Sequence, residues 1–98
     1  MNGHFIYVIR PVRTGFAGGM TANEERLMDE HFDYLKSLLA AGALVMAGPC
    51  TDAAFGVVVF RAESEAAART IMESDPAVRG GIATAELHPF RISLQSGK

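Results

Sequence analysis

Residues 43–61 read ALVMAGPCTDAAFGVVVFR, and this stretch predicts two strands joined by a turn. The first strand, Ala43 to Ala47, stops at Gly48-Pro49, a pair that favours a turn. The second, Phe55 to Arg61, is almost continuously apolar, which is typical of a central strand covered on both faces. Cover on both faces is a first indication that a second subunit takes part in the fold.

A long amphipathic segment precedes this stretch. Thr21 and Glu24 have the spacing of a capping box, so a helix is expected to start there and to run to about Ala41. Gly42 then supplies a left-handed stop. The apolar positions recur at intervals of three and four, which marks one buried face: Leu27, Met28, Phe32, Leu35, Leu38 and Leu39.

A second helix and two outer strands complete the pattern. Ser64 is a favourable N-cap for a helix over residues 65–74, and Asp75-Pro76 ends it because proline disfavours helical geometry in the residue before it. Residues 77–83 are expected to form a loop. Residues 4–12 (HFIYVIRPV) and 85–94 (AELHPFRISL) are typical of strands.

The resulting order is βαββαβ, in a single α+β domain over residues 1–98. Right-handed crossovers place the strands in a ferredoxin-like, four-stranded antiparallel sheet with both helices on one face. The other face would remain bare, and an exposed apolar sheet face of that size normally marks an interface. The sequence therefore predicts a homodimer that pairs through its sheets.

Composition excludes several functions. The 98 residues include 11 acidic and 9 basic ones, a net charge of −2 without a basic stripe, so a nucleic-acid partner is not expected. A single cysteine, Cys50, rules out an internal disulfide and fits a cytoplasmic location. No apolar run is long enough to cross a membrane. No CxxC or HExxH pattern occurs, so we expect neither a metal nor another cofactor.

Two residues stand out as candidates for acid–base chemistry. His31 lies within the apolar stripe of the first helix, where it is either a buried neutral histidine or a general acid or base. Asp75 either simply ends the second helix or pairs with a basic group, since a carboxylate at a helix C-terminus faces the negative end of the helix dipole. A His31–Asp75 pair would orient the imidazole and stabilise its charged form.

Other candidates surround the glycine-rich loop over residues 13–20. The loop is either a mobile connection or a lid, and it lacks the ending of a phosphate-binding loop. Three arginines are either carboxylate ligands or solvated surface residues: Arg10, Arg13 and Arg91. Nothing near Cys50 in the sequence would lower the pKa of its thiol, so a reactive role is not expected.

The ordered set of these features resembles the YCII-related (YciI-like) family over nearly the whole chain. The residues that carry the resemblance are Arg13, Phe16, Met20-Thr21, His31, Tyr34-Leu35, Gly42, residues 47–50, residues 52–56, residues 75–78 and residues 86–91. The resemblance implies a dimeric α+β barrel fold and an active site centred on a histidine and an aspartate. In this chain those roles fall on His31 and Asp75.

Two hypotheses follow. In the first, the chain is a cofactor-independent enzyme in which His31 moves a proton on a small aromatic or cyclic substrate and Asp75 supports it. Arg13 and Phe16 would cover the substrate, and Gly48-Pro49 would shape the pocket wall. In the second, the chain is a non-catalytic, ligand-binding or regulatory homodimer. A His31–Asp75 contact in an open pocket favours the enzyme, whereas separated or enclosed side chains favour the second hypothesis.

Overall fold

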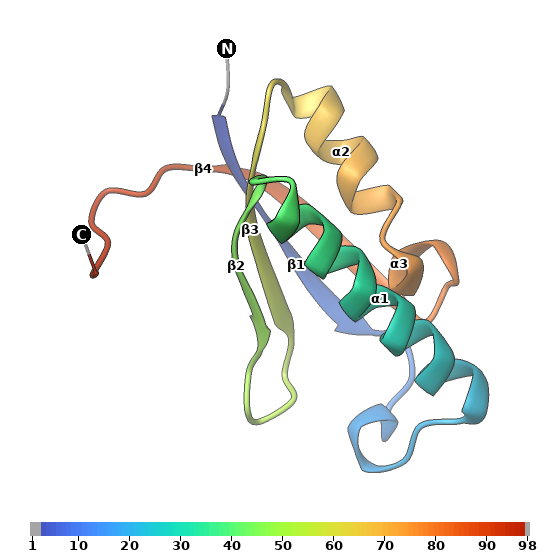
Figure 1. Ribbon diagram of the computed structural model, residues 1–98. Coiled ribbons are helices and arrows are strands. Elements are labelled where there is room, and N and C mark those ends of the chain that lie inside the picture. The colour runs from blue at the N-terminus through green and yellow to red at the C-terminus, as the bar shows by residue number, and fades with distance from the viewer. Residues whose placement is uncertain (1–2, 98) are drawn as a thin grey trace.

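A four-stranded antiparallel sheet with helices on one face forms the framework of the computed structural model, which describes residues 3–97 (Figure 1). In chain order the elements are β1 (Gly3–Pro11), a 3-10 turn η1 (Phe16–Gly18), α1 (Ala22–Ala40), β2 (Leu44–Pro49), β3 (Gly56–Ala62), α2 (Glu65–Glu73), α3 (Pro76–Arg79) and β4 (Ala83–Phe90). The strands lie in the order β2-β3-β1-β4, so the predicted ferredoxin-like arrangement is confirmed.

The predicted signals at the ends of α1 are present. The Thr21 side chain accepts a hydrogen bond from the backbone of Glu24, and the Glu24 carboxylate accepts one from the backbone of Thr21. At the other end, Gly42 has a φ of 81°, the left-handed conformation that glycine adopts without steric cost. The chain therefore turns directly from α1 into β2.

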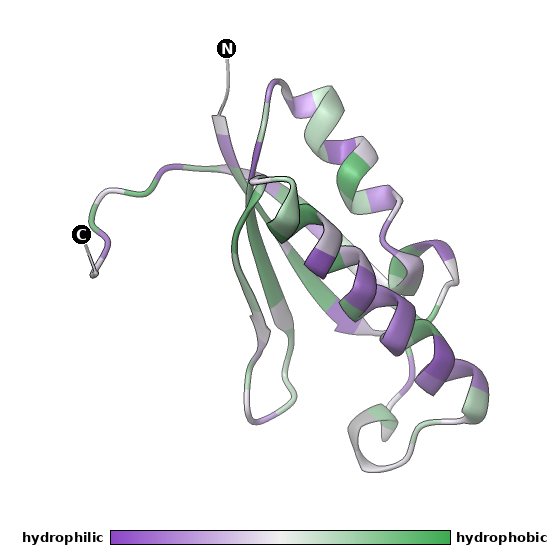
Figure 2. Cartoon of the chain, viewed as in Figure 1, coloured by the Kyte–Doolittle hydropathy of each residue, from purple (hydrophilic) through white to green (hydrophobic). Residues whose placement is uncertain are grey.

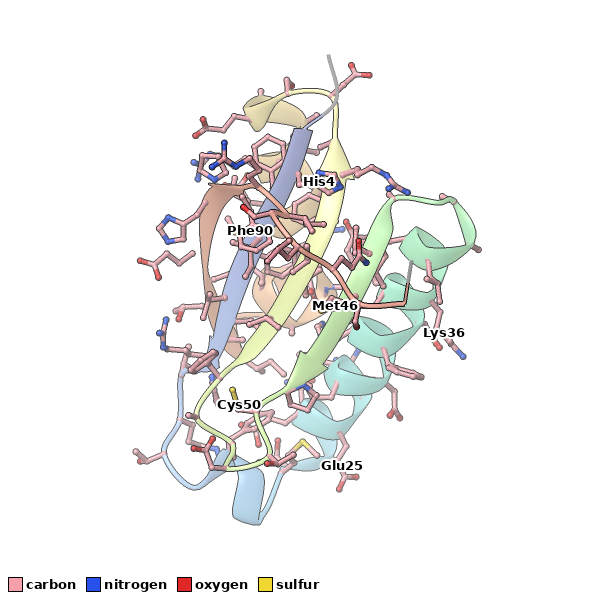
Figure 3. The ribbon with its side chains drawn as sticks, turned by 90° about the vertical axis from the view of Figure 1, so that its left-hand side faces the viewer. His4, Glu25, Lys36, Met46, Cys50 and Phe90 are labelled. Carbon is pink, nitrogen blue, oxygen red and sulfur yellow. The ribbon has the colours of Figure 1, made fainter. Side chains whose placement is uncertain are left out.

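The bounds of several elements differ from the prediction: β2 continues through Gly48-Pro49, where a turn was expected, and β4 begins at Ala83. The loop expected over residues 77–83 contains the short helix α3, because Pro76 is well suited to the first turn of a helix and Asp75 caps it. β4 ends at Phe90 instead of Leu94. Beyond it, the chain crosses the face of the sheet that the helices leave open, toward β2 and Met46 (Figure 3).

The core lies between the helices and the sheet. Alternate residues of the two central strands face the helices, and Tyr7 on β1 is paired with Val58 on β3. The main buried cluster contains Phe5, Tyr7, Leu35, Val58, Phe60, Ala62, Ala68 and Met72. Hydrophilic residues run along the outer side of α1 (Figure 2). Two residues of the predicted buried stripe are instead mostly exposed, because Phe32 (61%) and Leu39 (58%) line an open cavity beside β2.

A smaller cluster fixes α3 against α1. Leu27, Ala77 and Ile82 form it. A Cβ atom at Gly80 would lie 2.6 Å from the Leu27 Cδ1 atom and 2.9 Å from the Pro76 carbonyl oxygen. Only glycine fits at this position without displacing its neighbours. The close approach of α3 to α1 brings residue 75 beside the middle of α1.

Candidate active site

His31 lies on the inner side of α1, one turn from each of the buried residues Leu27 and Leu35. Its side chain is 12% exposed. The helix thus holds the ring at the boundary between the core and a cavity that it lines. This position agrees with the predicted place of His31 in the apolar stripe.

Asp75 is fully buried and is the N-cap of α3. Its Oδ1 atom accepts a hydrogen bond of 3.0 Å from the backbone N–H of Ala77. The expectation that Asp75 ends the second helix was therefore incomplete, since Ser74 is the C-cap of α2 and Asp75 begins the next helix. A carboxylate at a helix N-cap satisfies a backbone N–H that would otherwise lack a partner.

The two side chains meet. The Nδ1 atom of His31 lies 2.8 Å from both carboxylate oxygens of Asp75. Because the other groups that contact this carboxyl, from Tyr7 and Ala77, both donate, the carboxyl acts as an acceptor and Nδ1 carries the proton. In the neutral ring the Nε2 atom then holds the free lone pair.

Tyr7 is a third member of this cluster that the sequence did not single out. Its hydroxyl donates a hydrogen bond of 2.6 Å to Oδ2 of Asp75, and both residues are fully buried. Burial, and then the charge of Asp75 and this hydrogen bond, raise the pKa of Tyr7 far above its ordinary value. The hydroxyl therefore remains a hydrogen-bond donor and cannot serve as a base.

A large apolar cavity adjoins the pair. Its volume is about 1030 Å³, and it lies between α1, the β2–β3 hairpin and the segment that leads into α1. His31 lines it, as do the predicted substrate-binding residues Phe16, Gly48 and Pro49. Cys50 also lines it, from the turn between β2 and β3 (Figure 3).

Arg13 does not line this cavity. Its guanidinium instead forms a two-pronged ion pair with Glu24, with Nε 2.9 Å from Oε2 and Nη2 2.6 Å from Oε1. Nη2 also donates to the carbonyl of Gly19. Arg13 thus anchors the segment before α1, and its role in covering a substrate stays a prediction.

Within residues 3–97, no group of three His, Cys, Asp or Glu side chains is placed to hold a metal ion. No helix in the same part of the chain is long and apolar enough to cross a membrane.

The fold and the site together define a class: a βαββαβ protein with a buried His–Asp pair beside an apolar cavity. The chain matches the YCII-related domain over residues 8–91 and belongs to that family. None of the curated proteins compared with the chain matches it.

Solved structures share the fold. One is 5-chloro-2-hydroxyhydroquinone dehydrochlorinase from Burkholderia phenoliruptrix in complex with 2,5-dihydroxybenzoquinone, with 18% identity over 89% of this chain and 93% of that one and a TM-score of 0.66. Another is SnoaB, a cofactor-independent oxygenase from Streptomyces nogalater, with 13% identity over 99% and 98% of the two chains and a TM-score of 0.51. An uncharacterised protein from Thermotoga maritima has 8% identity over 93% and 100%, with a TM-score of 0.55. At these identities the likeness shows the fold alone.

Proposed function

We propose that this chain is a cofactor-independent enzyme that moves a proton on a small ring-containing substrate, with His31 as the base and Asp75 as its partner. One observation carries the proposal: His31 Nδ1 lies 2.8 Å from a fully buried carboxylate while the same ring lines an open cavity. This geometry supports the enzyme over the non-catalytic dimer.

The proposed step uses the two nitrogens of one ring. The Nε2 atom takes a proton from the substrate, and the imidazolium that forms keeps its Nδ1–H bond to Asp75. The buried carboxylate stabilises the new positive charge, and Tyr7 and Ala77 keep that carboxylate in place. A ring bound against the apolar walls would displace water from the pair, which would strengthen these electrostatic interactions. Phe16, Gly48 and Pro49 would contact the substrate.

The similar solved structures suggest where to look for a substrate. One is named as a dehydrochlorinase of a chlorinated hydroxyhydroquinone and another as a cofactor-independent oxygenase. A panel of chlorinated hydroxyhydroquinones and cyclic enols, followed by proton NMR, is therefore the first assay. On a verified substrate we expect His31→Ala to lower the rate by roughly 10²- to 10⁴-fold. Asp75→Asn should also lower it, because an amide no longer fixes the Nδ1–H tautomer.

Asp29→Ala is the control, because Asp29 is an exposed, titratable residue of α1 that does not line the cavity. A His31→Ala chain that retained the full rate would refute the proposal. A wild-type chain that binds ring compounds in the cavity but turns over none of the panel would instead support the ligand-binding dimer.

The working unit in this proposal is a cytoplasmic homodimer formed through the open face of the sheet. Apolar residues of the central strands lie on that face, among them Val8 and Val57, which are paired across β1 and β3. The cytoplasmic location rests on Cys50 as the only cysteine of the chain.

A further inference from the structure

The cavity beside His31 has an unusual balance of charge. Its described lining contains no aspartate or glutamate, although acidic residues outnumber basic ones in the whole chain, 11 to 9. The titratable side chains in that lining are His31, Lys36 and Cys50. The walls are otherwise almost entirely apolar, so they offer a bound molecule one permanent positive charge, and the carboxylate nearest to that charge, from Asp33, lies outside the lining.

Lys36 supplies that charge from the same helix as His31. Its ammonium lies 5.3 Å from the centre of the Phe32 ring, a distance at which a cation and an aromatic face attract each other. The nearest carboxylate oxygen, from Asp33, is 3.7 Å away, and the lysine side chain is 61% exposed. An exposed ion pair of this length contributes little, so the ammonium is available to an anion at the cavity mouth.

The spacing of Lys36 and His31 limits what can contact both. Five residues of an α-helix correspond to about 7.5 Å along the axis and to about 140° around it, so Lys36 lies at the mouth of the cavity and His31 at its inner end. The wall between and around them is apolar and includes Phe32, Leu35 and Met28. An anionic group at Lys36 would therefore place an attached ring against this apolar wall, on the side of the cavity that leads inward to His31.

We propose that the cavity binds apolar, ring-containing anions, with the anionic group at Lys36 and the ring directed toward His31. The proposal shares its cavity with the proposed function but does not depend on proton transfer. It also moves the anion-binding role from Arg13, which is engaged by Glu24, to Lys36.

Two fluorescent probes of similar shape test the charge. 8-Anilinonaphthalene-1-sulfonate is an anion, whereas N-phenyl-1-naphthylamine is its neutral counterpart. We expect Lys36→Met to weaken binding of the anionic probe roughly three- to tenfold and to leave the neutral probe within about twofold. Lys36→Arg should retain the anionic probe. Added salt should weaken that probe's binding to the wild type more than to Lys36→Met.

The control variant is Arg69→Met, which removes one positive charge from the exposed side of α2, outside the cavity. Methyl NMR of the methionines locates the probe, since Met20 and Met28 line the cavity and Met72 is buried in the core. We expect shifts at Met20 and Met28 and none at Met72.

The proposal would be overturned if Lys36→Met and Arg69→Met had the same affinity for the anionic probe. It would also be overturned if the probe bound without shifting the methyl signals of Met20 and Met28. These outcomes differ from failure of the proposed function, which is an unchanged rate in His31→Ala. A cavity that binds the anionic probe through Lys36 but supports no turnover would retain this proposal and remove the other.

Discussion

Glu24 joins the start of α1 to the segment that supplies Phe16 to the cavity wall. Its carboxylate accepts hydrogen bonds from the backbone of Thr21 and from two nitrogens of Arg13. The hydrogen bonds from Arg13, and next the backbone bond from Thr21, lower the pKa of Glu24 to about 2. A sequence pattern predicted the capping role of this residue, but the Arg13 contact spans eleven positions and required the fold.

This lowered pKa predicts how stability depends on pH. A carboxyl whose pKa is lower in the folded than in the unfolded state stabilises the fold above the unfolded value, about 4.5, and loses that contribution as the pH falls toward about 2. Glu24→Gln keeps the capping geometry without the charge. We expect its Tm to lie below that of the wild type at neutral pH, and the difference to shrink as the pH falls below about 4.5.

Thermal unfolding followed by circular dichroism measures this difference. Glu25→Gln is the control, because it removes an exposed carboxylate from the same helical turn and leaves the Arg13 pair intact. A Tm difference for Glu24→Gln that stays constant from neutral pH to about pH 3 would contradict the assigned role of the ion pair.

At the scale of elements, the site depends on how closely α3 approaches α1. Gly80 permits that approach, since a Cβ there would overlap Leu27 and the Pro76 carbonyl oxygen.

We expect Gly80→Ala to destabilise the fold by about 1–3 kcal/mol, the usual cost of overpacking a core. Urea unfolding measures the change. Gly48→Ala is the matched control, because a Cβ at Gly48 meets nothing within 4 Å, and its effect should be within about 0.5 kcal/mol. Equal stability of Gly80→Ala and the wild type would show that α3 can move.

The elements also show what a sequence can and cannot predict. Each main helix and strand was predicted from local patterns, because caps, turns and periodicity act over a few residues. The contact of Asp75 with Tyr7 joins positions 68 residues apart and has no local pattern. One signal was available: a tyrosine on the buried side of a strand needs a hydrogen-bond partner. The helix α3 was missed because four residues are too few to show a period.

At the scale of the whole molecule, one face of the sheet remains without a helical layer. The chain after β4 crosses one end of this face, where it passes β2 and Met46 (Figure 3). The tail lies beside Val59, which is only 6% exposed, so it covers part of the apolar face, while Leu94 within the tail adds a side chain that is 95% exposed. Apolar residues of β1 also lie on this face, because Ile6 and Val8 point away from the helices, opposite to Phe5 and Tyr7.

We therefore expect the wild-type chain to have about twice the mass of one chain in light scattering at micromolar concentration. Ile6→Lys should produce a monomer, because it places a charge in the middle of an apolar contact between two sheets, where desolvation is costly. The residue is paired with Val59 and His88, so its side chain lies near the centre of the face.

Ala66→Lys adds the same charge on the exposed side of α2 and should remain a dimer. A monomeric wild type would contradict pairing through the sheet. If Ile6→Lys and Ala66→Lys were both folded dimers, the interface would have to lie on another surface, and the exposed apolar residues around the cavity mouth, Phe32 and Leu39, would be the next place to test.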